Sequence, residues 1–434
     1  MRSGEPAPDG HVARLRYGRG EISARLDQAF RVKVVAPPGS ERPPDPVGLL
    51  ARALEKPVAS PALADLAPGK RRVVISIPDG TRPQVARHVL PDLVARLRAS
   101  GVDLHTITIF VASGAHAGSS EDQLRELAGE GVPREIAIHQ NYARRAPDFR
   151  LVGITRRGTP VMLNNLLLEA DLNVVVGSVA FHYFAGMTGG RKMIMPGACH
   201  VQTIVANHKL TLAEDGTLNP MCATGNLEGN PVHEDMLEGA AYLRNVFMVN
   251  AVLDGWGDIR EITCGEPVRS HLEATRLAKQ LLEVPVGERC DLAIAGAGGH
   301  PMDVDFIQTH KSIDHAAEAV RDGGALVIAA ECSAGVGSET FLPWFSMGGA
   351  RAVSRRLRAQ YQLNAQTALA LMKKLERIRV FMVTRLERAT VESMGIAFAA
   401  TLEEAVEAAR ANLGPSPLTY VLPIAWGIVP FVEA

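Results

Sequence analysis

The sequence predicts an α/β protein of two domains with mostly parallel sheets. Short apolar runs of strand length alternate with amphipathic segments of helix length, the pattern of chains that build parallel sheets. At 434 residues, the chain is too long for one ordinary hydrophobic core. The stretch 284–287 is a predicted linker. We therefore expect one domain over 1–284 and a second over 288–413, with a last strand within 415–434 that could return to the first domain.

Composition and charge limit the classes of function. Lys plus Arg is 46 and Asp plus Glu is 47, so the net charge of −1 gives no bulk basic field to attract nucleic acid. The sequence contains no run of about 18 apolar residues that could span a bilayer. We expect neither a nucleic-acid partner nor membrane association.

The cysteines indicate a reducing compartment. They are five in number, far apart and without a CxxC pair, which argues against a disulfide framework and a structural zinc site. The N-terminal stretch is rich in Arg, Gly and Pro and lacks the apolar core of a signal peptide. We expect a cytoplasmic protein.

The first part of the chain is weakly patterned. Residues 31–35 predict an edge strand, and five prolines between Ala36 and Pro46 predict a loop. The first strong strand is 73–77. Proline and glycine end it, so Asp79, Thr81 and Arg82 project from a strand end. Taken alone, this turn would be ordinary, with one local ion pair.

A second strand end carries a histidine. A helix over 89–100 is followed by a strand over 106–111, which leads into small residues around His116. Those small neighbours would leave the imidazole uncovered. A helix over 121–129 and strands over 136–138 and 172–176 complete the alternation.

The densest group of reactive side chains lies in the glycine-rich loop 181–197, directly after the strand 172–176. His182 stands just past the strand end, and Lys192 follows two glycines that allow positive φ or close approach to a ligand. His208 comes sixteen residues after Lys192. Each residue alone could belong to an anion-binding loop or a solvated turn, but their density favours function. Ligands of α/β sheets bind beyond the C-terminal strand ends, so these loops could converge on one cleft.

The rest of the chain has fewer reactive groups. After an irregular segment, 211–231, we expect strands over 246–253 and 259–263 and a helix over 271–282. The second domain begins with a strand over 292–295 and a helix from about 305 to 320. This helix carries Gln308 and Lys311 on one face, and their spacing alone favours a solvated helix surface. Further strands over 325–330, 379–383 and 420–424 and a helix over 401–412 are predicted.

Several common catalytic motifs are absent from the sequence. The nearest dinucleotide fingerprint, 296–301, has Pro301 in place of its third glycine. The sequence contains no Walker A loop, no HExxH and no GxSxG. An ordinary nicotinamide dehydrogenase, a P-loop enzyme and a zincin are therefore not supported.

Together, the motifs resemble those of the nickel-dependent lactate racemases and their homologues. The resemblance covers nearly the whole chain and rests on separated motifs in one order: DGTRP at 79–83, SGAH at 113–116, HYFAG…GGRK…PG at 182–197, NH at 207–208 and QTHK at 308–311. It implies two α/β domains with the active site in the cleft between them.

The resemblance also implies a cofactor, the nickel-pincer nucleotide, pyridinium-3,5-bisthiocarboxylic acid mononucleotide. By this resemblance Lys192 would form a covalent thioamide to it, and His208 would be the one protein ligand of nickel. A square-planar nickel site accepts imidazole beside sulfur donors. The nucleotide would be contacted by Asp79, Gly80, Thr81 and Arg82. The cofactor-synthesis enzymes are the implied partners.

The implied reaction is racemisation or epimerisation of a 2-hydroxy acid by proton-coupled hydride transfer through a 2-keto acid. His116 and His182 would be the acid/base pair, since histidine titrates near neutral pH. Gln308 and Lys311 would hold the small-molecule substrate. Two alternatives are a non-catalytic carrier of the metallated nucleotide and a cofactor-dependent oxidoreductase that releases the keto acid.

Three departures from the family pattern leave the particular 2-hydroxy acid open. Ala117 follows the first catalytic histidine where many members have arginine, and Ile307 stands where tyrosine is common. His310 and His315 add imidazoles to the helix of Gln308.

Overall fold

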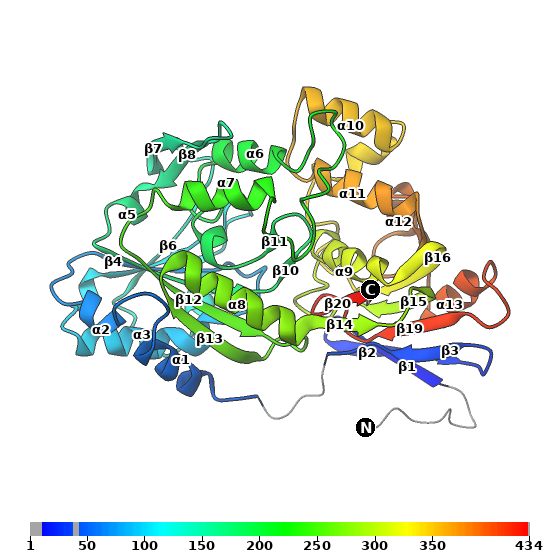
Figure 1. Cartoon of the computed structure of the whole chain (residues 1–434), viewed down its shortest axis with the longest axis horizontal. Helices are drawn as coiled ribbons and strands as arrows, with labels where there is room; N and C mark the ends of the chain where they lie inside the picture. The colour runs from blue at the N-terminus through cyan, green and yellow to red at the C-terminus, as the bar shows by residue number, and fades with distance from the viewer. Residues whose placement is uncertain (1–10, 38–42, 433–434) are drawn as a thin grey trace. The chain divides into compact units, whose positions relative to one another are not determined.

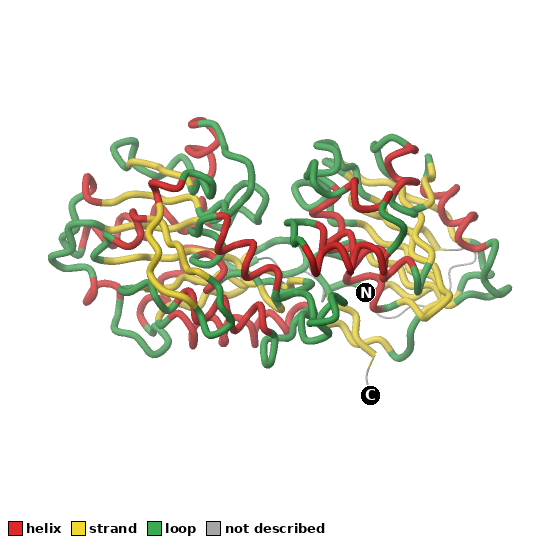
Figure 2. Tube along the Cα trace, turned by 90° about the horizontal axis from the view of Figure 1, so that it is seen from above, coloured by secondary structure: helices red, strands yellow, loops and turns green. Residues whose placement is uncertain are grey.

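The computed structural model describes residues 11–37 and 43–432. The described chain divides into two compact units. We call residues 43–211 and 219–280 the central unit, and residues 11–37, 212–218 and 281–432 the terminal unit, because the latter contains both ends of the described chain. Figure 2 shows strands of each unit running between helices.

The central unit is built on a six-stranded sheet in the order β13-β12-β9-β4-β5-β6. Neighbouring strands are parallel except for the antiparallel β12–β13 pair. Every residue of β9 is buried, as expected for a middle strand covered on both faces. The strands are β4 (Val73–Ile77), β5 (Ile107–Val111), β6 (Ala137–Gln140), β9 (Leu172–Val179), β12 (Val246–Leu253) and β13 (Ile259–Gly265).

Helices flank this sheet, with α1, α2 and α3 together on one side and α6 and α7 on the other (Figure 1). The helices are α1 (Pro46–Glu55), α2 (Leu63–Leu66), α3 (Ala86–Ala99), η1 (Leu104–Thr106), α4 (Glu121–Ala128), η2 (Ala146–Asp148), α5 (Asn165–Leu168), η3 (Gly190–Met193), α6 (Val201–Lys209), α7 (Pro231–Ala240) and α8 (Pro267–Leu282). Two hairpins complete the unit: β7 (Phe149–Ile154) with β8 (Pro160–Asn164), and β10 (Phe181–His182) with β11 (Gly186–Met187).

The terminal unit contains a second six-stranded sheet, in the order β18-β17-β16-β15-β19-β3, and all its neighbours are parallel. Its strands are β3 (Arg31–Val34), β15 (Cys290–Gly296), β16 (Val320–Ala329), β17 (Arg379–Val383), β18 (Ala397–Ala399) and β19 (Leu418–Leu422). Its helices are α9 (Phe306–Glu318), η4 (Leu342–Ser346), α10 (Ala350–Ala359), α11 (Ala365–Leu375), α12 (Arg388–Ser393) and α13 (Leu402–Arg410).

Side chains of β15 alternate between two hydrophobic cores, one on each face of this sheet. Ala293 and Ala295 join the core formed with α9, α10 and α11. Leu292 and Ile294 join the core formed with α13 and an antiparallel hairpin of β1 (His11–Tyr17) and β2 (Gly20–Leu26). The two-residue period of a strand explains this division. The predicted α/β class with mostly parallel sheets is confirmed.

The two ends of the chain do not belong to the domain that the sequence predicted for them, a first domain over 1–284 to which a strand within 415–434 could return. Strand β3, from the early part of the chain, pairs with β19, and β19 pairs with β15, so both segments belong to the terminal sheet. The expected linker at 284–287 instead contains the end of β14 (Glu283–Val286), which pairs in parallel with β20 (Val429–Val432). Local patterning cannot reveal such long-range pairing. The expected loop from Ala36 to Pro46 includes residues 38–42, outside the described residues.

None of the described helices is long and apolar enough to cross a membrane.

Candidate active site

The predicted site residues of the central unit follow three neighbouring parallel strands. β4 and β5 end at the paired residues Ile77 and Val111, and β9 lies on the other side of β4. The loops beyond β5 and β9 are joined, because the Gly114 amide donates to the Gly197 carbonyl at 2.9 Å. The sheet therefore brings the expected loops to one edge.

Asp79 fixes the orientation of His116. The Asp79 Oδ2 lies 2.6 Å from the His116 Nδ1, and its Oδ1 accepts from the Thr81 amide at 3.0 Å and the Thr81 hydroxyl at 2.6 Å. A carboxylate can only accept hydrogen bonds, so the His116 Nδ1 carries a proton and donates. In the neutral ring, Nε2 then has the lone pair. The His116 side chain is 42% exposed and therefore accessible to a small molecule.

The carboxyl of Asp79 is ionised although it is buried. Burial alone would raise its pKa, but the charge and hydrogen bond of His116, with Arg82 and the Thr81 hydroxyl, outweigh burial and hold the pKa far below its usual range. Asp79 therefore remains a charged partner for His116 throughout the physiological pH range.

His182 has the opposite arrangement. Its side chain is buried, and its Nδ1 accepts from the amides of Phe184 at 3.4 Å and Ala185 at 3.3 Å. An acceptor nitrogen carries no proton, so the neutral ring of His182 has its proton on Nε2. The tight β10–β11 hairpin supplies these amides. In their neutral forms the two histidines therefore differ, because Nε2 is bare in His116 and carries the proton in His182.

Phe184 connects three of the predicted residues. Its ring centroid lies 4.5 Å from that of His182, 5.1 Å from that of His208 and 5.2 Å from the Nζ of Lys192. Lys192 lies in η3, two residues after Gly190, and Gly189 and Gly190 both have positive φ. At Gly189 an added Cβ would lie 2.8 Å from the Ser178 carbonyl oxygen, so the loop passes too close to β9 for a side chain.

A network behind His208 sets its tautomer. The Asn207 amide nitrogen donates to the Asp235 Oδ2 at 2.9 Å and the Val232 carbonyl at 3.2 Å, so the Asn207 Oδ1 is the atom that faces the His208 Nδ1, at 3.2 Å. His208 therefore donates from Nδ1 and keeps the lone pair of Nε2. Asp235 is fully buried and is held by Thr155 and Thr159.

His208 has the properties of a metal ligand. Desolvation by burial, together with the positive charges of Lys192 and His116, lowers its pKa to about 3, so the ring is neutral at neutral pH, as metal binding requires. Among the described residues, no group of three or more His, Cys, Asp or Glu side chains is arranged to hold a metal.

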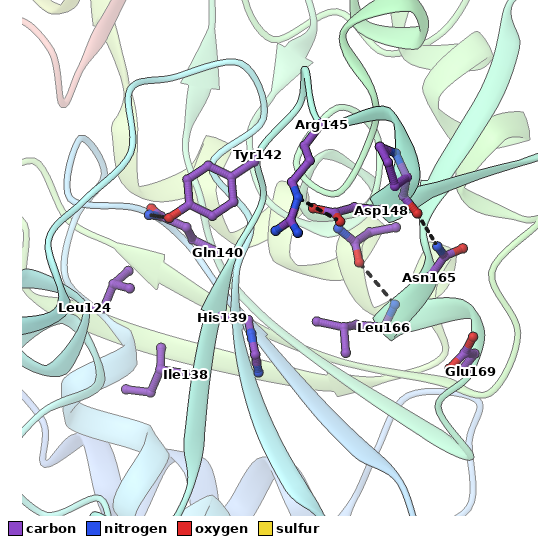
Figure 3. A pocket seen from close by; sticks show the side chains of 12 residues that line it. Leu124, Ile138, His139, Gln140, Tyr142, Arg145, Asp148, Asn165, Leu166 and Glu169 are labelled. Carbon is purple, nitrogen blue, oxygen red and sulfur yellow. Dashed lines mark hydrogen bonds and ion pairs between the residues drawn. The ribbon is translucent and has the colours of Figure 1, made fainter.

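A cavity of about 610 Å³ opens beside His116. Tyr142, Arg144 and Arg145 line it, together with small residues and Asn141. An adjacent pocket of about 310 Å³ shares Tyr142 and Arg145 (Figure 3). There, Arg145 points toward Asp148 and the Tyr142 hydroxyl meets Gln140 at 2.7 Å. No predicted site residue lines this smaller pocket.

In the terminal unit, Gln308 and Lys311 lie near the start of α9. The Lys311 Nζ donates to the Gln308 Oε1 at 2.6 Å, and Gln308 is 9% exposed, so the pair is not a fully solvated surface. His310 and His315 are buried in the same helix, and the His315 Nδ1 lies 3.1 Å from the Ala425 carbonyl. These two imidazoles therefore belong to the interior of the unit.

Sequence reasoning missed two supporting residues. Phe184 belongs to the motif at 182–197, but its position between His182, Lys192 and His208 depends on a hairpin only two residues deep on each side. Asp235 acts on His208 through Asn207 from a different helix. An acidic residue in a helix without a nearby basic partner was the only signal for Asp235.

Comparisons with known proteins agree over most of the chain. A family model described as the lactate racemase N-terminal domain matches residues 17–218, and one described as the lactate racemase C-terminal domain matches residues 286–429. A lactate racemase from Thermoanaerobacterium thermosaccharolyticum is 34% identical over 297 residues, 68% of each chain. One from Lactiplantibacillus plantarum is 30% identical over 386 residues, 87% of this chain and 89% of the relative.

The fold is also that of a solved relative. The structure of the lactate racemase apoprotein from Thermoanaerobacterium thermosaccharolyticum superposes with a TM-score of 0.87 and 29% identity, covering 98% of this chain and all of the other.

Proposed function

This chain belongs to the lactate racemase family, an isomerase family, and we propose that it inverts the C2 stereocentre of a 2-hydroxy acid such as lactate. The observation that carries the proposal is that two imidazoles follow the ends of β5 and β9, the neighbours of β4 on either side: His116, held by Asp79, and His182, in the hairpin after β9. An acid/base pair that acts on both enantiomers needs one base and one acid in each turnover, and an imidazole can serve as either.

The histidines act on the substrate hydroxyl. The bare Nε2 of His116 accepts the hydroxyl proton of one enantiomer, and Asp79 stabilises the imidazolium that forms. As the opposite enantiomer is completed, His182 donates a proton to the oxygen from its imidazolium form and becomes neutral, so the pair holds the same number of protons before and after the turnover. In the reverse direction the two roles are exchanged, which makes the reaction a racemisation.

The residues present fit the nickel-pincer nucleotide that the family resemblance implies. His208 offers a neutral Nε2 to nickel, Lys192 offers an amine on a glycine-rich loop for the covalent link, and Asp79 through Arg82 would contact the nucleotide. When bound, this group supplies an acceptor that takes up the C2 hydrogen as hydride and returns it. Gln308 and Lys311 are the proposed ligands of the substrate carboxylate.

The five cysteines are all free, which supports a cytoplasmic location as part of this proposal. The cofactor-synthesis enzymes are the proposed partners, since the group must be made before it is attached.

The test uses protein produced together with the cofactor-synthesis enzymes and a 2-hydroxy acid deuterated at C2. The label should remain largely in the inverted product. His116→Ala and His182→Ala should each lower the racemisation rate roughly 10²–10⁴-fold, the usual contribution of a general acid or base. The control is His139→Ala, an exposed histidine of the small pocket, which should leave the rate unchanged.

Three outcomes would contradict the proposal. Loss of the label to water would show that C2 is deprotonated directly. Release of stoichiometric keto acid would favour an oxidoreductase, and a loaded protein without turnover of any 2-hydroxy acid would favour a carrier.

A further inference from the structure

A second cavity of the central unit, of about 490 Å³, is lined by residues of η3, α7, β12 and the start of α8. Its volume lies in the range of small-molecule sites. Most of its wall is apolar, formed by Ile194, Leu237, Ala240, Leu243, Val246, Met248 and Leu272. Leu272 is 48% exposed, so the cavity reaches the surface at this residue.

The inner end of the cavity carries the buried guanidinium of Arg191. Its side chain is 2% exposed, and one amino group donates to the Ala185 carbonyl at 2.8 Å. The Nε of Arg191 has no hydrogen-bond partner among the described residues. A guanidinium has five N–H donors, so most of this charged group lacks a clear acceptor.

His271 does not supply the missing acceptor. Its Nε2 lies 2.9 Å from the Thr188 carbonyl and 3.2 Å from an amino group of Arg191. A carbonyl can only accept, so the His271 Nε2 uses its proton to donate to Thr188 and has no lone pair for Arg191. An added Cβ at Gly190 would lie 2.4 Å from the His271 ring, which shows how closely the loop packs on this imidazole.

His233 adds a third basic side chain. It is 7% exposed, and its Nδ1 has no hydrogen-bond partner among the described residues. Glu266 is the only carboxylate among the lining residues, and it accepts from the amides of Val268 at 3.1 Å and Arg269 at 2.7 Å. Glu266 therefore caps the start of α8 and does not pair with Arg191.

A buried cation without a counter-charge is unfavourable, and burial is the cause that lowers the pKa of Arg191 to about 9. Arg191 is still charged at neutral pH. Burial, followed by the charge of Arg191, lowers the pKa of His233 and of His271 to about 3 each, so both rings are neutral. The inner end of the cavity thus has one net positive charge.

We propose that this cavity binds a small organic carboxylate as an effector. The carboxylate group would accept hydrogen bonds from the N–H groups of Arg191 and His233. The apolar part of the ligand would lie against the apolar wall. The wall favours an organic acid over inorganic phosphate. Because Arg191 directly precedes Lys192 in η3, an occupied cavity would hold the loop that carries this lysine.

The test is isothermal titration calorimetry of the full chain without cofactor, with n-butyrate as the probe and n-butanol as its neutral counterpart. Butyrate should bind saturably at one site, and butanol should not. Arg191→Gln should weaken butyrate binding at least tenfold. Ala241→Phe fills the rim of the cavity from an exposed position at the end of α7 and should have the same effect without removing a charge.

Arg156→Gln is the matched control, because this arginine is 92% exposed in the same unit and should leave the affinity unchanged. Circular dichroism establishes whether each variant is folded. If Arg191→Gln does not fold, Ala241→Phe still tests the proposal. Absence of saturable butyrate binding would overturn the proposal. So would butyrate binding that Ala241→Phe leaves unchanged, or saturable binding of inorganic phosphate alone. None of these outcomes depends on racemase activity.

Discussion

Replacing Asp79 by Asn removes one negative charge while keeping the shape of the side chain. The Asn oxygen can still accept from the Thr81 amide and hydroxyl, so that part of the loop should stay in place. The amide group that replaces Oδ2 is a donor and cannot accept the Nδ1 proton of His116. The substitution therefore tests whether His116 depends on its 2.6 Å contact with a carboxylate.

The expected cost follows from the type of bond. Hydrogen bonds to charged groups contribute about 1.5–3 kcal/mol. The His116 side chain is 42% exposed, so solvent screens the pair and the lower end of about 1.5 kcal/mol applies. Each 1.36 kcal/mol changes a rate about tenfold. We therefore expect kcat/KM for racemisation to fall by about tenfold or slightly more in Asp79→Asn.

The control is Asp92→Asn. Asp92 also contacts its basic partner, Arg96, at 2.6 Å, but the pair is one helical turn apart on α3 and its side chains are 23% and 40% exposed. Such helix pairs contribute only about 0.3–0.5 kcal/mol. Asp92→Asn should leave kcat/KM unchanged. Equal kcat/KM for Asp79→Asn and the parent protein would refute the orienting role of Asp79.

The same variant has a pH signature. The pKa of Asp79 is depressed in the folded protein, so its charge stabilises the fold above the unfolded pKa of about 3.9. This stabilisation is lost as the pH falls through the folded pKa. The difference in denaturant midpoint between parent and Asp79→Asn should shrink as the pH falls below about 4. A constant difference in acid would contradict the depressed pKa.

Three further predictions concern the glycine loop and the terminal unit. Gly190→Ala should lower the free energy of unfolding by about 1–3 kcal/mol more than Gly158→Ala. Both glycines have positive φ, but only at Gly190 would an added Cβ lie 2.4 Å from a ring, that of His271. Chemical denaturation compares the two variants, and equal losses would refute the close packing. Lys192→Ala should lose the covalent cofactor mass, whereas His208→Ala should keep that mass and lose nickel. Mass spectrometry and metal analysis measure the two quantities, and the reverse result would exchange the two roles. Lys311→Ala should cost about 1.5–3 kcal/mol of transition-state stabilisation, obtained from the fall in kcat/KM at unchanged nickel content, and unchanged steady-state kinetics would remove Lys311 from the substrate site.

The strands of both sheets were the most predictable part of the fold. Runs such as 172–176 and 246–253 are almost entirely apolar, and such runs are buried wherever they occur in a parallel sheet. The unit boundaries were not predictable, because β3 belongs to the terminal sheet through backbone hydrogen bonds with β19. Backbone pairing between distant segments leaves no mark on the local pattern of either strand.

The candidate site was predictable as a set of residues but not as a set of protonation states. His116, His182 and His208 stand out because each follows an element end or lies in a distinctive motif. Their tautomers depend on a carboxylate from another loop, on two backbone amides of a hairpin and on the orientation of Asn207. Only the folded arrangement reveals these partners.

The pairing of β3 with β19 also sets an order of events during translation. Arg31 in β3 bonds Ser416, next to β19, across a separation of 385 residues. A ribosome that adds about 5–20 residues per second needs roughly 20–80 s to make that distance. The central unit is synthesised within this interval, while β3 waits for β19, its neighbour in the sheet. Nascent chains of this protein therefore carry β3 unpaired until β19 is made, and an unpaired strand is the kind of segment that chaperones protect from edge-to-edge association.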